Sequence, residues 1–131
     1  MLLTFVFAIN ASRVFSEATT PVSSNKKYLL FALSKTNENY EAYSTPSILM
    51  EALNGLLNKA RTECNGNDLN IPVVGTGLSR SGIPLEYAVE LIMIAILNSA
   101  KNREITKNIN IIIHESQFEK IDLKTIKNKW E

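Results

Sequence analysis

The stretch that most constrains the fold is residues 69–85, where a short apolar run leads into a glycine-rich loop and then into a long apolar segment. Residues 71–74 have the composition of a buried strand, and Pro84 suits the first turn of a helix. The loop between them contains Gly75, Gly77 and Gly82. A strand, a glycine-rich loop and a helix in this order predict an anion site, because backbone N–H groups and a helix N-terminus converge there.

The loop supplies all the predicted binding residues. It has neither the Gly-Lys-Ser/Thr of a P-loop nor the third glycine of a dinucleotide fingerprint, so an ordinary strand-to-helix turn stays open as the alternative. Arg80 offers the one charged side chain for a contact with phosphate. The candidate ligand-binding residues are Gly75, Thr76, Gly77, Leu78, Ser79, Arg80, Ser81 and Gly82.

Composition narrows the class of protein. The chain has 131 residues, of which 45% are apolar and 21% charged, as expected for a single globular domain. The net charge of +1 gives no electrostatic footprint for nucleic acid. The single cysteine, Cys64, excludes an intrachain disulfide, and with one histidine it argues against a zinc site. We therefore expect a cytoplasmic protein without a metal or cofactor.

Two apolar segments resemble membrane-associated sequences. Residues 1–11 contain no Lys or Arg ahead of their apolar run, so we expect a strand over 2–8 rather than a signal peptide. The segment 84–100 is interrupted by Glu90 and Asn98 and falls short of a membrane span. We expect it to form a buried helix and expect no membrane partner.

The remaining pattern alternates between strands and helices. Strands are expected over 2–8, 27–34, 69–74 and 108–114, and polar connections over 16–25, 35–44 and 115–120. Helices are expected from Pro46 with Thr45 as N-cap, over 84–100, and after Asp122 as N-cap as far as Trp130. This order predicts an α/β domain with a largely parallel sheet. The glycine loop follows a strand, and ligands of such sheets bind at the carboxyl ends of the strands.

Several residues outside the glycine loop have side chains that serve binding or catalysis in other proteins. We expect Asn10 to lie in a surface turn rather than to contact a ligand. We expect His114 to have a structural role rather than to line the pocket. Cys64 has no partner that would make it a nucleophile, and no pair of carboxylates suggests acid–base chemistry, so no catalytic residue is expected. We expect the tyrosines to pack rather than to stack on a base, namely Tyr28, Tyr40, Tyr43 and Tyr87.

Four segments resemble a macro domain. They are Lys-Tyr-Leu-Leu-Phe-Ala-Leu-Ser-Lys at 27–35, Ile-Pro-Val-Val-Gly-Thr-Gly-Leu-Ser-Arg at 71–80, Ile-Asn-Ile-Ile-Ile at 109–113, and Lys-Ile-Asp-Leu-Lys at 120–124. The chain is most similar to the divergent macro domains in effectors of the Thoeris anti-phage defence system. The resemblance covers about residues 27–130, and we expect one domain over 1–131 with a divergent or truncated part at 1–26.

The resemblance implies a three-layer α/β/α fold with a mixed, largely parallel sheet. It also implies that the backbone amides of residues 75–82 wrap the diphosphate and distal ribose of an ADP-ribose-like nucleotide, which in the Thoeris subgroup is a TIR-made signal. We expect a non-enzymatic binding module. A macro fold that lost its ligand and an ADP-ribosyl hydrolase are the alternatives, and the identity of the nucleotide, a homo-oligomer, a TIR-system partner and a receptor or scavenger role stay open.

Overall fold

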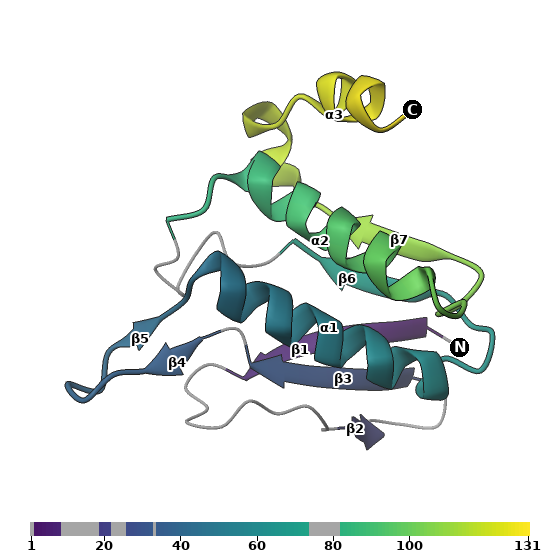
Figure 1. Cartoon of the computed structure of the whole chain (residues 1–131), viewed down its shortest axis with the longest axis horizontal. Helices are drawn as coiled ribbons and strands as arrows, with labels where there is room; N and C mark the ends of the chain where they lie inside the picture. Colours follow the sequence, from purple (N-terminus) through teal and green to yellow (C-terminus); the bar gives the residue numbers. More distant parts are fainter. Residues whose placement is uncertain (1, 9–18, 22–25, 33, 74–81) are drawn as a thin grey trace.

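A computed structural model describes residues 2–8, 19–21, 26–32, 34–73 and 82–131, and Figure 1 shows their arrangement. The predicted α/β class is confirmed, because strands and helices alternate along most of the chain and two of the helices pack against a sheet.

The main sheet contains five strands in the order β2-β3-β1-β6-β7. Strand β1 (Leu2–Ala8) pairs in parallel with β3 (Lys26–Ala32) and with β6 (Leu69–Pro72), and β6 pairs in parallel with β7 (Ile109–Ile112). Strand β2 (Thr19–Pro21) adds an antiparallel edge beside β3. The segment 16–25, expected to be only a loop, therefore contains a short strand.

A small hairpin occupies the segment 35–44, which the sequence predicted as an irregular connection. Its strands are β4 (Lys35–Thr36) and β5 (Ala42–Tyr43). Asn37 closes the turn, because its side-chain oxygen accepts hydrogen bonds from the backbone N–H groups of Asn39 and Glu41, each at 2.9 Å. Two-residue strands leave too short an alternation to be recognised in a sequence.

Helix α1 (Pro46–Glu63) begins where the sequence predicts. The Thr45 hydroxyl accepts a hydrogen bond from the N–H of Ile48 at 3.2 Å, and Pro46 occupies the first helical turn, so this cap prediction is confirmed. One face of the helix is buried, through Leu49, Ala52, Leu53, Leu56, Leu57 and Ala60.

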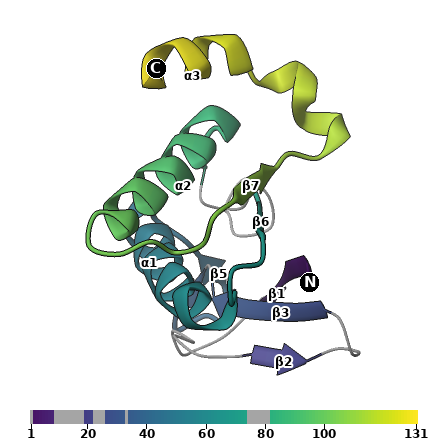
Figure 2. The ribbon, with the colours of Figure 1, turned by 90° about the vertical axis from the view of Figure 1, so that its right-hand side faces the viewer.

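Helix α2 (Leu85–Ala100) lies beside α1 on the same face of the sheet (Figures 1 and 2). The connections β3–α1–β6 and β6–α2–β7 step in the same direction across the sheet, and right-handed crossovers then place both helices on one face. The core lies between the helices and this face, where Leu29, Leu69 and Ile71 are buried.

The C-terminal segment forms the 3-10 helix η1 (Glu115–Lys120) and helix α3 (Leu123–Trp130). Asp122 is the N-cap of α3, as predicted, whereas η1 replaces an expected irregular connection. Ile121 and Ile126 are buried in a second cluster with Val89 of α2. Helix α3 therefore packs against α2, and the third layer of the predicted α/β/α arrangement stays a prediction.

Arg61 connects α1 to the C-terminal end of α2 through hydrogen bonds. Its Nη2 donates hydrogen bonds to the carbonyl and the hydroxyl oxygen of Ser99, each at 2.8 Å, and at 3.3 Å to the carbonyl of Arg103. Helix α2 has no basic residue in its own last turn, so Arg61 supplies the positive charge that favours this end of the helix.

The buried face of α1 gives a stability prediction. Leu53 is fully buried, so Leu53→Ala should lower the free energy of unfolding by about 2–5 kcal/mol through lost burial and the cavity left behind. Leu123, which is 46% exposed, is the matched control, and Leu123→Ala should change it by roughly 0.5 kcal/mol or less. Denaturant unfolding measures both variants, and equal losses would contradict the assigned core.

Candidate functional site

The parallel pairing of β6 and β7 brings two carboxyl strand ends to one edge of the sheet. Beyond the last paired residues, the N–H of Val73 donates a hydrogen bond to the carbonyl of Ile112 at 2.9 Å. The described chain ends here at Val73 and resumes at Gly82, just before α2 (Figure 1). This is the edge at which open α/β sheets bind ligands.

The last residue of the predicted loop, Gly82, has a backbone conformation that favours glycine. Gly82 has a φ of +63°, and a Cβ added there would meet no atom within 4 Å. The residue is therefore required by backbone conformation and not by space. Pro84 is the N-cap residue of α2 and makes no side-chain capping hydrogen bond, so the helix begins one residue later than the sequence predicted.

Only one of the predicted binding residues lies in the described part of the chain, and it is Gly82. The other predicted loop residues lie outside the described part, namely Gly75, Thr76, Gly77, Leu78, Ser79, Arg80 and Ser81. Asn10 lies outside it as well. The structure describes the residues that flank this gap, Val73 after β6 and Gly82 before α2, and the binding role of residues 75–82 stays a prediction.

His114 has a local structural role, as predicted. The residue is exposed and is the N-cap of η1, where its Nδ1 accepts a hydrogen bond from the N–H of Ser116 at 3.2 Å. The same nitrogen lies 2.8 Å from the Ser116 hydroxyl oxygen. Both contacts engage the Nδ1 atom of the imidazole within the first turn of η1.

The other weighed residues divide into buried and exposed groups. The Cys64 thiol is fully buried at the end of α1. The packing prediction is wrong for Tyr40, Tyr43 and Tyr87, which are 90%, 41% and 59% exposed. Among the described residues, no cluster of three potential metal ligands occurs, and no helix is long and apolar enough to cross a membrane.

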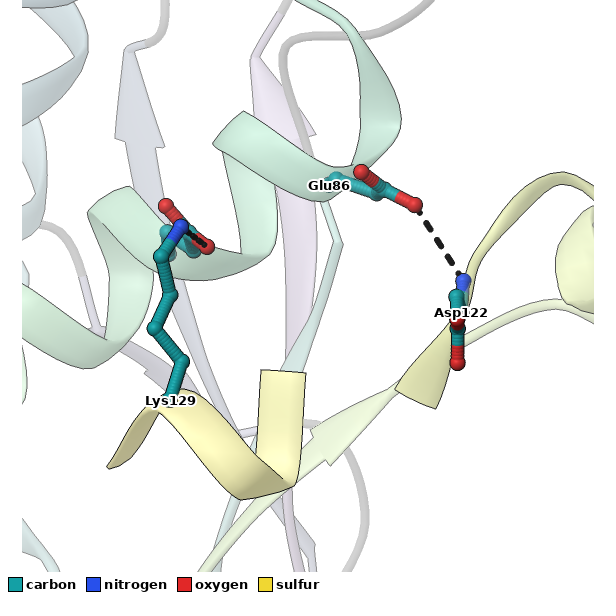
Figure 3. Close-up of polar contacts among 4 residues, drawn as sticks. Glu86, Asp122 and Lys129 are labelled. Atoms are coloured by element: carbon teal, nitrogen blue, oxygen red, sulfur yellow. Dashed lines mark hydrogen bonds and ion pairs between the residues drawn. The ribbon is translucent and has the colours of Figure 1, made fainter. Parts of the chain in front are cut away.

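Sequence reasoning missed the contacts that hold α3 on the first turns of α2. Glu86 Oε1 accepts a hydrogen bond from the N–H of Asp122 at 3.2 Å, and Lys129 Nζ forms an ion pair with Glu90 Oε1 at 2.8 Å (Figure 3). These partners are far apart in sequence, so no local pattern pointed to them. Their effect is to fix the start of α2, where the glycine loop returns.

Two charged groups on α3 have shifted pKa values. The Thr125 hydroxyl and the Thr125 backbone N–H donate to the Asp122 carboxylate, at 2.7 and 3.0 Å, and they lower the pKa of Asp122. The hydrogen bond and charge of Glu90 raise the pKa of Lys129. Both shifts favour the charged forms that hold the end of the chain in place.

The Asp122 cap predicts a loss of α3 in acid. Because the folded-state pKa of Asp122 is lowered, its stabilisation is present above the ordinary aspartate pKa and is lost as the pH falls through the folded value, below about pH 4. Asp122→Asn should keep the cap at all pH values, since asparagine caps as well as aspartate, whereas Asp122→Ala should weaken α3 even at neutral pH. NMR chemical shifts of residues 123–130 report the helix, and an identical acid response in wild type and Asp122→Asn would contradict the cap.

Comparison with models of known protein families finds a match for this chain. The model of the family described as "Thoeris protein ThsA, Macro domain" matches residues 14–114, a range that includes the glycine loop. The match begins before residue 27, where the sequence resemblance was expected to start, and it ends before η1 and α3. No curated protein matches the chain. The chain belongs to the family of Thoeris ThsA macro domains.

Proposed function

We propose that this protein is a binding module for an ADP-ribose-like nucleotide and that residues 75–82 hold the diphosphate. The observation that carries the proposal is the family match, which spans the entire unit of β6, the loop and α2. The ligand proposed for this subgroup is a signalling nucleotide made by a TIR enzyme, a derivative of ADP-ribose that carries an imidazole group.

The geometry at the carboxyl edge of the sheet favours the binding of an anion. The N-terminus of a helix carries a partial positive charge and unsatisfied N–H groups, and α2 begins directly after the loop without a side-chain cap. Glu86, the acidic residue in the first turn, accepts a hydrogen bond from Asp122. The positive φ of Gly82 suits a loop whose backbone approaches a ligand closely.

The proposed roles follow from residue chemistry. Backbone amides of residues 75–82 donate to the diphosphate oxygens, and the Arg80 guanidinium adds a charge-assisted contact. The protein binds the nucleotide without cleaving it, works with a TIR-containing partner system, and acts in the cytoplasm, where the Cys64 thiol stays reduced.

A glycine pair separates a binding effect from a folding effect. Gly82 and Gly66 both have positive φ, and a Cβ meets no atom within 4 Å at either position. Gly82→Ala and Gly66→Ala should therefore each cost about 1–2 kcal/mol of stability. Only Gly82→Ala should also weaken ADP-ribose binding, by about tenfold, which isothermal titration calorimetry measures. Equal affinities in the two variants would place the ligand elsewhere.

Thermal shift tests the ligand class and Arg80. ADP-ribose at one hundred times its dissociation constant should add about 2.7 kcal/mol of apparent stability. Arg80→Ala should weaken binding by about 1.5–3 kcal/mol, whereas Arg103→Ala, an exposed arginine after the far end of α2, should leave it unchanged. No shift with ADP-ribose or an imidazole-bearing derivative would refute the proposal, and release of ADP-ribose from a modified protein substrate would show a hydrolase instead.

A further inference from the structure

Helix α2 has an apolar face that points away from the core. The sequence predicted a buried helix, but Tyr87, Ile94 and Leu97 are 59%, 43% and 52% exposed. Tyr87 and Ile94 are about two turns apart, and Leu97 follows about one turn later, so they form one stripe along the helix. We call these three residues the α2 stripe.

The neighbouring helices leave the stripe open in the part of the chain that the structure describes. The core side of α2 is buried through Ala88, Ile92 and Ala95, and Val89 packs against α3. A surface hollow of about 450 Å³ adjoins the stripe. Its lining is largely apolar and consists of Pro46, Gly82, Ile83, Pro84, Tyr87, Glu90, Leu91 and Ile94.

The spacing of the stripe is typical of a helix that packs along another helix. Tyr87, Ile94 and Lys101 recur at one heptad position, and Glu90 and Leu97 recur at the other. In such packing, a side chain of one helix enters a hole between side chains of the other. The hollow beside Leu91 and Ile94 has the place and apolar character of such a hole.

The charged residues near the two ends of the α2 stripe favour a second copy of α2 in antiparallel orientation as its partner. Acidic Glu86 and Glu90 lie in the first turns of α2, whereas basic Lys101 and Arg103 follow its last turn. A second copy of α2 in antiparallel orientation would set each basic end beside an acidic start. A parallel copy would set like charges side by side. The net charge of +1 opposes self-association only weakly.

We propose that the α2 stripe is the interface of a homodimer in which the two copies of α2 cross antiparallel midway between Ile94 and Leu97. In this arrangement Ile94 meets Leu97 of the second copy, and Leu97 enters the second copy's hollow beside Ile94. Lys101 lies beside the second copy's Glu90, which already pairs with Lys129 of its own chain. Such a two-fold contact is self-complementary, as closed dimers require.

Sedimentation velocity across a range of protein concentrations tests the interface. Wild type should show a monomer–dimer equilibrium, and Ile94→Glu should raise the dimer dissociation constant at least tenfold. Ile112 is the matched control, because it is a similarly exposed isoleucine (47%) on β7, and Ile112→Glu should leave the equilibrium unchanged. A wild type that stays monomeric at every concentration, or equal effects of the two variants, would overturn the proposal.

A charge reversal tests the antiparallel orientation and does not depend on the apolar substitution. Lys101→Glu should weaken the dimer several-fold, and adding Glu90→Lys to it should restore the dimer. Because Glu90→Lys also breaks the contact with Lys129, Lys129→Ala serves as the control and should leave the dimer intact. Failure of the double variant to recover while Lys129→Ala dimerises normally would overturn the antiparallel arrangement.

Discussion

The burial of β6 beneath α1 and α2 is the constraint on which the rest of the structure depends. Leu69 and Ile71 are fully buried on the helical side, and the strand pairs in parallel with β1 and β7. A shift of one residue would turn both side chains to the other face, so the register is firmly specified. The carboxyl end of β6, after which residues 74–81 lead to α2, is thereby fixed at this edge of the sheet.

Helix α2 connects the three features of functional interest. Its first two turns follow the predicted glycine loop in the sequence, and they contact the C-terminal segment where Glu86 accepts a hydrogen bond from Asp122 and Glu90 from Lys129. Its last turn is held by Arg61 from α1. Between these ends, its inner side completes the core while the α2 stripe stays open. A single helix thus supports the proposed nucleotide site at one end and offers the proposed dimer surface along its length.

Local signals in the sequence predicted those parts of the fold that local interactions determine. The caps at Thr45 and Asp122 and the apolar spacing of α1 were recognisable, because each depends on residues within one or two turns. The exposed face of α2 was not, since a helix that is apolar on most sides does not reveal which side meets the core. Arg61 and Lys129 were missed because their partners lie 38 and 39 residues away. For the candidate site, the glycine-rich composition of residues 75–82 was enough to predict them as binding residues, and the family match covers this range. The positive φ of Gly82 could be learned only from the structure.

The central claim is that a nucleotide diphosphate binds at the glycine loop, and residue-resolved NMR of the wild-type chain titrated with ADP-ribose tests it most directly. The account predicts that the largest changes in amide chemical shift fall on residues 75–82 and on the first turn of α2, where backbone N–H groups would meet the phosphates. The far end of α2, around Asn98 and Asn102, should change little. Saturating ADP-ribose that leaves the loop amides unmoved, or shifts concentrated at that far end, would contradict the account.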